Sequence, residues 1–265
     1  MCGRYAASRN PDDLVEEFEL VEKPEESLPA SYNVAPTQNV YAVVERAPRD
    51  EPEADPVRSL RVVKWGLVPS WAKDPKIGNR MINARMETVA EKPAYKRAFA
   101  KRRCLLPADG YFEWYGEKGS KQPFFIRPKD NGVMAMAGLY ELWKDKDAPE
   151  GTDPWLWTCT VLTTSAPDDL GRIHDRMPLL VEPARYGDWL DPAKDDPDEL
   201  SGLLVPAAPG RLLAYPVGTD VNNVRNNRPD LVEPIPAEAA AAEGGAAEGA
   251  RAQDATADAD QPELF

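Results

Sequence analysis

The chain has 265 residues, of which 42% are hydrophobic, and its 27 prolines and 17 glycines suit one large domain or two small ones with many loops. Its 32 Lys and Arg residues against 45 Asp and Glu residues give a formal net charge of −13; this argues against a generic polyanion binder, although a local basic groove stays compatible with an acidic average. No apolar run reaches the roughly 20 residues of a membrane span, and the start of the chain lacks a signal-peptide pattern, so we expect a soluble protein.

The few cysteines and the single histidine limit which metal sites the chain can form. Cys2, Cys104 and Cys159 are an odd number at wide spacings, a pattern that predicts neither a disulfide framework nor a zinc site. His174 is the only histidine, so too few ligands remain for most His/Cys metal sites. We therefore expect no metal and no cofactor. The protein is expected in a reducing cytoplasm, and Cys104 and Cys159 are expected to be inert core residues.

Local signals predict short helices between many strands. Asn10 followed by Pro11 and acidic residues is typical of a helix start, and β-branched and aromatic runs indicate strands. In chain order the sequence predicts a helix at about 11–20, a strand at 39–44, a solvated loop at 45–58, a strand at 60–68, a helix at 93–101, strands at 104–107, 110–115, 122–127, 133–142 and 155–163, a short helix starting at 165, a helix at 197–204 and a last strand at 212–217. From about Ala237 the chain is Ala-, Glu-, Gly- and Asp-rich and is expected to be disordered.

Cys2 follows the initiator methionine. A small residue at this position normally lets an aminopeptidase remove Met1, which would leave Cys2 with a free α-amine beside its thiol. The amine titrates near pKa 8 and the thiol near 8.5. Such a 1,2-aminothiol can condense with an aldehyde through an imine to a thiazolidine ring. The alternative is that a cysteine at position two is accidental.

Two further side chains are candidates for proton transfer. Glu113 lies in an aromatic strand, where alternation puts it on one face with Tyr111 and Tyr115. It is either a partly desolvated acid with a raised pKa, suited to proton transfer, or part of an exposed sheet face. Any imidazole chemistry must use His174, whose alternative is a plain surface position.

Other residues suggest contacts with a nucleic acid. Asn83 and Arg85 lie two apart and would share one face of a strand, where they could hold a sugar oxygen and a phosphate; the alternative is a loop-capping Asn and a surface Arg. Trp65, Trp71 and Trp114 offer planar faces for unpaired bases, and the alternative for each is a place in the core.

Six segments, taken together and in order, resemble the SRAP family, the SOS-response-associated, abasic-site-processing proteins. The resemblance covers about residues 2–234. The segments are Met1-Cys2-Gly3-Arg4-Tyr5, Tyr32-Asn33-Val34-Ala35-Pro36, Trp65-Gly66-Leu67-Val68-Pro69-Ser70-Trp71, Asn83-Ala84-Arg85, Gly110-Tyr111-Phe112-Glu113-Trp114 and His174-Asp175-Arg176-Met177-Pro178.

The resemblance implies a single α+β domain with a β-rich core, short flanking helices and a narrow groove for DNA. It implies covalent capture of abasic sites in single-stranded DNA, which would protect the strand during replication-associated repair. The residues that it implicates are Cys2 as nucleophile with Asn83, Glu113 and His174 around it, Arg4, Arg85 and Arg176 toward phosphates, and Pro36, Trp65, Trp71 and Trp114 toward flanking bases.

The implied reaction begins with the abasic sugar opening to its aldehyde, and Glu113 would donate the proton that this requires. The Cys2 amine would then form an imine with loss of water. The thiol would close the thiazolidine, with His174 or Glu113 moving protons. Ring closure removes the imine that would otherwise drive β-elimination and strand breakage.

The end of the chain carries a separate signal. Gln261-Pro262-Glu263-Leu264-Phe265 resembles peptides that dock on replication sliding clamps, with Gln261, Leu264 and Phe265 as the contacts. The tail at 235–260 would act as a flexible tether with a reach of roughly 25–30 Å. The alternative is that the match of the last five residues is accidental. We expect a cytoplasmic monomer without membrane contacts, nucleoid-associated when it is bound to DNA.

Three other functions stay open. One is an N-terminal-nucleophile amidohydrolase of the glutamine amidotransferase type, although His174 stands here without the Trp that this class has after its Arg. Another is a non-covalent reader of single-stranded DNA damage that does not use Cys2. The third is peptide-bond cleavage, in its simplest form the removal of residues before Cys2.

Overall fold

The structure is a computed structural model, and it describes residues 2–48, 51, 53–117, 120–166 and 168–236. The predicted disordered tail from Ala237 and the predicted clamp contacts Gln261, Leu264 and Phe265 lie outside the described residues. Within the described part, no helix is long and apolar enough to cross a membrane.

Five long strands form a closed ring of pairings, which we call the large sheet. β10 pairs with β9, β9 with β6, β6 with β3, β3 with β4, and β4 with β10; only the last pairing is parallel. Two short strands, β5 and β11, add to the C-terminal half of β10. The bounds are β3 Asn39–Arg46, β4 Val57–Trp65, β5 Asn83–Arg85, β6 Arg103–Ala108, β9 Met134–Lys144, β10 Trp155–Ser165 and β11 Arg176–Pro178.

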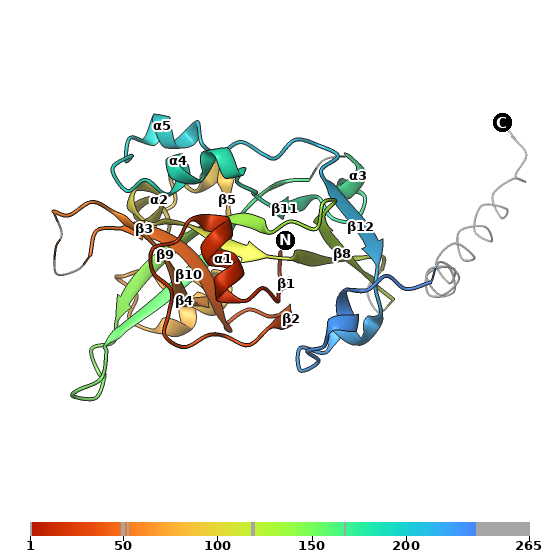
Figure 1. The fold of residues 1–265 in the computed structure, drawn as a ribbon, viewed down its shortest axis with the longest axis horizontal. Coiled ribbons are helices and arrows are strands. Elements are labelled where there is room, and N and C mark those ends of the chain that lie inside the picture. Colours follow the sequence, from red (N-terminus) through yellow and green to blue (C-terminus); the bar gives the residue numbers. More distant parts are fainter. Residues whose placement is uncertain (1, 49–50, 52, 118–119, 167, 237–265) are drawn as a thin grey trace, which may run out of the picture.

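A second sheet of five antiparallel strands packs against the large one. Its order is β12-β8-β7-β1-β2, so the N-terminal strand β1 lies inside the sheet between β7 and β2. Figure 1 shows β8 and β12 to the right of the large sheet, and β1 near the centre of the view. The bounds are β1 Tyr5–Ala7, β2 Ser31–Val34, β7 Gly110–Tyr115, β8 Gln122–Pro128 and β12 Leu212–Pro216.

Short helices cover one side of the large sheet. α1 begins where the side chain of Asn10 accepts hydrogen bonds from the first turn, and it ends at Phe18 because Glu19 takes a left-handed backbone, with φ 52°. The α-helices are α1 Pro11–Phe18, α2 Lys96–Lys101, α3 Asp168–Gly171, α4 Tyr186–Leu190 and α5 Pro197–Ser201, and the 3₁₀ helices are Pro75–Arg80, Met86–Thr88, Pro183–Arg185, Thr219–Asn222 and Pro229–Val232.

The core divides into three clusters that follow these layers. The first packs the helices on the large sheet, with Phe99 and Trp189 among its members. The second lies between the two sheets and includes Cys2 and Trp65. The third packs the outer face of the second sheet against the loops after β12, with Phe112 among its members. The architecture confirms the predicted α+β class with a β-rich core and short helices.

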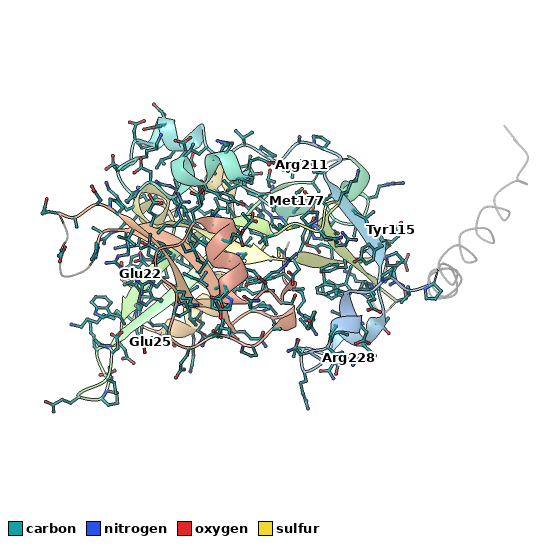
Figure 2. All side chains as sticks on the ribbon, viewed as in Figure 1. Glu22, Glu25, Tyr115, Met177, Arg211 and Arg228 are labelled. Atoms are coloured by element: carbon teal, nitrogen blue, oxygen red, sulfur yellow. The ribbon has the colours of Figure 1, made fainter. Side chains whose placement is uncertain are left out.

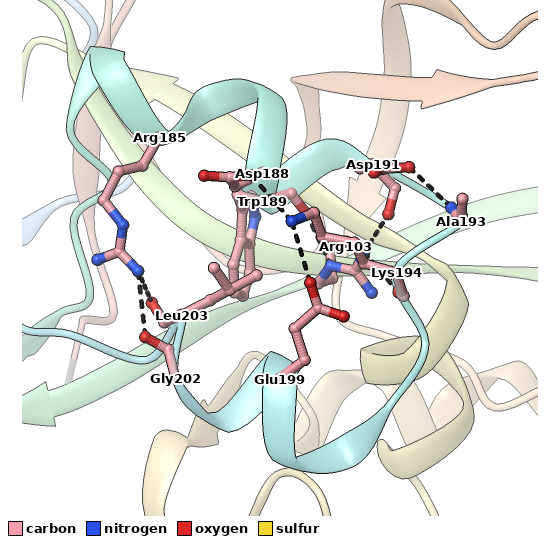
Figure 3. Close-up of polar contacts among 10 residues, drawn as sticks. All are labelled: Arg103, Arg185, Asp188, Trp189, Asp191, Ala193, Lys194, Glu199, Gly202 and Leu203. Atoms are coloured by element: carbon pink, nitrogen blue, oxygen red, sulfur yellow. Dashed lines mark hydrogen bonds and ion pairs between the residues drawn. The ribbon is translucent and has the colours of Figure 1, made fainter.

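A buried arginine fastens the α4–α5 region to the large sheet. Arg103, at the start of β6, is 2% exposed, and its guanidinium donates only to backbone carbonyl groups (Figure 3). Nε donates to Trp189 O at 2.7 Å, and Nη1 donates to Phe99 O and Ala100 O at 2.8 Å each. Nη2 donates to Asp191 O and Lys194 O. Burial lowers the pKa of this guanidinium, yet its donors are satisfied on every side.

The predicted loop at 45–58 is wrong at both ends, because β3 continues to Arg46 and β4 begins at Val57. Glu45 and Arg58 are register partners on these two strands, and their side chains form an ion pair with 2.9 Å between Arg58 Nε and Glu45 Oε2. Charged residues that pair across the two strands therefore extend both strands into the ends of the expected loop. The short strands β1, β2 and β11 were not predicted, whereas Asn83 and Arg85 were expected to share one face of a strand, and they lie on β5.

Candidate functional site

Cys2 lies in the layer between the two sheets, fully buried. Asn83 on β5 donates from Nδ2 to the Cys2 carbonyl oxygen at 2.7 Å. On the other side, Phe112 N donates to Arg4 O at 2.9 Å, which pairs this segment with β7. Burial is the main cause that raises the pKa of the Cys2 thiol well above its usual range. Cys2 is therefore held between both sheets with its thiol protonated at neutral pH.

The side-chain oxygen of Asn83 is an unused hydrogen-bond acceptor beside Cys2. Its Oδ1 is buried and has no hydrogen-bond partner among the described residues. A buried amide oxygen without a donor costs free energy. Asn83 Oδ1 is therefore suited to accept a hydrogen bond from a group that binds next to the Cys2 backbone.

Glu113 lies on β7, beside the N-terminal segment. Tyr5 pairs with Tyr111 in an antiparallel register, so extending this register by two residues sets Gly3 opposite Glu113. The carboxyl group is 5% exposed, and burial raises its pKa to about 7. Its charge also contributes to the raised pKa of Cys2. The structure thus brings together a thiol and an acid that is about half protonated at neutral pH.

His174 precedes β11 and has a side chain that is 33% exposed. Arg176 N donates to its Nδ1 at 3.0 Å, while Asp175 Oδ1 lies 2.8 Å from the same nitrogen. The first contact requires a lone pair on Nδ1 and the second requires a proton there, so they belong to the neutral and the charged imidazole respectively. Burial lowers the pKa of His174, which favours the neutral form with its hydrogen on Nε2.

Arg176 is already engaged by the protein itself. Its Nη1 and Nη2 donate to the two carboxylate oxygens of Glu87 at 2.6 and 3.0 Å, and Nη2 also donates to Thr163 O at 2.6 Å. Glu87 has a lowered pKa because of its hydrogen bond to Arg176. A phosphate would have to compete with Glu87 for this guanidinium.

Beside Arg176 lies an open cavity of about 570 Å³ that Arg85 and Arg172 also line. Arg85 is exposed on β5, and Arg172 follows α3. Neither side chain forms a hydrogen bond or ion pair with another described residue. These two side chains are the cations best placed to meet an incoming anion.

Arg4 is likewise held by neighbouring groups. Its Nη1 donates to Asn33 Oδ1 and to Val221 O at 2.7 Å each, and its guanidinium stands 5.7 Å from the centre of the Trp114 ring. Trp114 Nε1 in turn donates to Asn222 Oδ1 at 2.7 Å. Burial lowers the pKa of Arg4. Its contacts tie the N-terminal segment to the loop after β12.

The predicted stacking residues fall into different environments. Trp65 is 0% exposed, and its Nε1 donates to Ile82 O at 2.9 Å; its ring therefore lies in the core, which is the alternative that the sequence left open. Trp71 is 61% exposed. Pro36 and Trp114 are half-buried.

Several residues at the site were not predicted as functional. Asn33 is 2% exposed and, besides accepting from Arg4, donates from Nδ2 to the carbonyl groups of Val221, Asn223 and Asn226. Glu87 and Arg172 had no signal of their own in the sequence. Asn33 lay inside one of the six family-like segments, which was the only hint of its importance. Among the described residues, no cluster of His, Cys, Asp and Glu could hold a metal ion.

Comparisons with known proteins support the family and the fold. The family model described as "SOS response associated peptidase (SRAP)" matches residues 1–224. A solved structure from Bacteroides thetaiotaomicron is similar with a TM-score of 0.74 and 25% identity, covering 89% of this chain and 100% of that one.

Named relatives cover most of the chain. Abasic site processing protein YoqW of Bacillus subtilis is 40% identical over 235 residues, covering 88% of this chain and 99% of the relative. Abasic site processing protein YedK of Escherichia coli is 32% identical, covering 89% and 100%. Abasic site processing protein HMCES of Gallus gallus is 34% identical, covering 77% and 66%. With a family model that matches most of its length and relatives at this identity, the chain belongs to the SOS response associated peptidase (SRAP) family.

Proposed function

We propose that this protein captures abasic sites in single-stranded DNA through Cys2 and leaves a thiazolidine cross-link. One observation carries the proposal: Cys2 is buried beside Glu113, an acid with a pKa of about 7, while Asn83 holds its backbone. The printed names of the relatives describe abasic site processing, which supports the same substrate. The chemistry requires that Met1 be removed first.

The reaction follows from the groups around Cys2. Protonated Glu113 donates to the ring oxygen of the closed sugar, the bond from C1′ to that oxygen breaks, and the anomeric hydroxyl gives its proton to solvent, which leaves the aldehyde. The neutral Cys2 amine adds to C1′ and loses water to give an imine. The thiol then adds across the C=N bond, and its proton ends on the nitrogen. No oxidant or reductant is needed.

The raised pKa of the Cys2 thiol bears on the order of these steps. A thiol that stays protonated at neutral pH is a weak first nucleophile, whereas the freed amine titrates near pKa 8. The amine therefore attacks first. The same property counts against the amidohydrolase alternative, in which the thiolate must begin the reaction.

The surrounding residues take supporting roles in this proposal. Asn83 Oδ1 accepts a hydrogen bond from the freed amine, and His174 moves the proton during ring closure. Arg85 meets a phosphate, Arg176 does so if Glu87 gives way, and Arg4 orients the N-terminal segment. Trp71, Trp114 and Pro36 meet the neighbouring bases.

The test compares wild type with Cys2→Ala on single-stranded DNA that holds one abasic site. Wild type is expected to give a cross-link that survives heating on a denaturing gel. Cys2→Ala keeps a small second residue and hence a free amine, so it should give only an imine, trapped by borohydride, together with strand cleavage. A heat-stable cross-link from Cys2→Ala would refute the proposal. Intact mass spectrometry checks that Met1 is absent from both proteins.

We also propose a sliding clamp as a partner for Gln261, Leu264 and Phe265. The support is the sequence resemblance alone. Clamp affinity measured with and without the last five residues tests it, and equal affinities would dismiss the idea.

A further inference from the structure

A second cavity lies at the end of the large sheet away from Cys2. β4 and β10 pair at only two positions, Lys64 with Thr158 and Trp65 with Cys159. Beyond these positions, residues of both strands line a cavity of about 450 Å³. The lining side chains used below are Glu22, Arg46, Arg61, Asp153, Trp155 and Trp157.

This cavity is separate from the candidate site. Trp157 precedes Val161, the β10 partner of Asn83, by four residues, which is roughly 13 Å along a strand. Figure 2 shows Glu22, at the border of the cavity, on the opposite side of the molecule from Tyr115 at the end of β7. Groups in the cavity therefore do not take part in chemistry at Cys2.

Two tryptophans form an aromatic platform in the cavity. Trp155 and Trp157 lie two apart on β10 and so share one face. The Trp157 ring stacks on Tyr140, with 5.5 Å between centroids and 13° between planes, while Lys144 covers one face of Trp155 at 5.8 Å. Both platform rings are half-buried.

The indole N–H groups of this platform are unused. Four other tryptophans, Trp65, Trp114, Trp143 and Trp189, each donate an Nε1 hydrogen bond within the protein. Nε1 of Trp155 and of Trp157 donates to no other described residue. Half-buried tryptophans with free donors are typical of surfaces that accept a ligand.

Among the charged side chains that line the cavity, one cation and one carboxylate are available. Arg61 is paired with Glu22 at 2.7 Å. Arg46 stands 5.5 Å from the centre of the Trp157 ring, and its terminal nitrogens have no hydrogen-bond partner within the described part of the chain. Asp153 uses one oxygen to accept from Trp155 N at 3.0 Å and remains exposed.

We propose that this cavity binds a nucleotide of the DNA strand at a distance from the lesion. The base stacks on the platform, as unpaired bases do on aromatic side chains, and Arg46 meets its phosphate. The exposed oxygen of Asp153 accepts from an exocyclic amino group, which cytosine, adenine and guanine carry and thymine lacks. The assignment of the nucleotide to this strand rests on the proposed function above.

The test measures non-covalent binding in a Cys2→Ala background, so that capture does not interfere. The probes are undamaged oligo(dC) and oligo(dT) in a series of lengths, together with free dCMP. Trp155→Ala and Arg46→Ala are expected to weaken binding of long oligo(dC) about fivefold or more, the range of a lost base stack. Trp155→Phe keeps an aromatic face and should restore most of the affinity. Asp153→Asn can still cap Trp155 N and should erase the preference for dC over dT.

The outcomes separate this inference from the function itself. Unchanged affinity of Trp155→Ala and Arg46→Ala for long oligo(dC) would overturn the nucleotide site, even if wild-type protein still cross-links abasic DNA through Cys2. Saturable dCMP binding that needs Trp155, with no dependence on oligonucleotide length, would overturn the assignment to the strand. Affinity that rises with length only when Trp155 and Arg46 are intact supports the proposal in full.

Discussion

At the scale of single residues, the site contains a buried acid that keeps its proton and an arginine that is already bound by protein groups. Glu113 is buried without becoming fully ionised, because burial raises its pKa to about 7. Arg176 is a cation whose guanidinium is taken up by Glu87 and Thr163. A buried acid with a raised pKa is typical of functional sites, where chemistry rather than folding decides which residue is present. The six family-like segments identified these positions, whereas the partners that hold them came only from the structure.

The pKa of Glu113 makes folding stability depend on pH. The folded protein keeps a proton that the unfolded chain, with a carboxyl pKa of 4.5, releases on the way to about pH 7. Stability is therefore lost as the pH rises from about 4.5 to 7 and is constant above this window. At about 1.4 kcal/mol for each unit of pKa, the loss is on the order of 3 kcal/mol.

Replacing Glu113 with Gln should separate stability from activity. Glu113→Gln removes the titration, so its free energy of unfolding at pH 8 should exceed that of wild type by about 1–3 kcal/mol. The cross-linking rate should fall about 10²–10⁴-fold and lose the decline above pH 7 that ionised Glu113 causes in wild type. Urea unfolding at pH 5 and 8, together with rates from denaturing gels, measures both. A variant less stable than wild type at pH 8 would contradict this account of Glu113.

At the scale of elements, the length of a strand determines whether the sequence can predict it. The long strands β9 and β10 were predicted to within two residues at each end, because apolar residues fill most of their length. β1, β2, β5 and β11 have three or four residues each, too few to show a period. The site draws on both kinds of element. β7, which carries Glu113, was predicted at 110–115 and observed at Gly110–Tyr115, whereas the contact between Asn83 on β5 and Cys2, just before β1, could not be predicted.

Arg103 is the residue on which the α4–α5 region depends. Lysine has one charged nitrogen and cannot reach the five carbonyl groups that the guanidinium serves. Arg103→Lys should therefore lower the free energy of unfolding by about 2–3 kcal/mol, since buried acceptors lose their donors. Arg185→Lys, at a half-buried arginine that donates to Gly202 O and Leu203 O in the same region, is the matched control and should cost less than 1 kcal/mol. Equal losses in urea unfolding would remove the special role of Arg103.

At the scale of the whole molecule, an acidic chain must still meet an acidic ligand. The formal charge is −13, and two of the predicted phosphate contacts, Arg4 and Arg176, are already engaged by protein groups. Arg85 and Arg172 remain at the cavity beside Arg176. Binding should therefore depend little on Coulombic attraction and more on stacking and on the covalent step.

The salt dependence of binding follows from this small number of free arginines. Each phosphate contact on single-stranded DNA contributes about −0.7 to the slope of log K against log salt. With three contacts, from Arg85 and Arg172 beside the candidate site and from Arg46 in the second cavity, non-covalent affinity should fall by about twentyfold between 50 and 200 mM KCl. Cross-linking should continue in molar KCl. A slope near −4 in a titration by fluorescence anisotropy, or loss of cross-linking in molar KCl, would contradict the shallow dependence.

The single imidazole of the chain also provides a spectroscopic reporter. Because His174 is the only histidine, every imidazole resonance in an NMR spectrum belongs to one position, with no need for assignment by mutagenesis. Its Nδ1 has one partner for each charge state, Arg176 N and Asp175 Oδ1. The nitrogen shifts therefore distinguish the two hydrogen-bonding arrangements and follow the proton there, in the free protein and after DNA has bound.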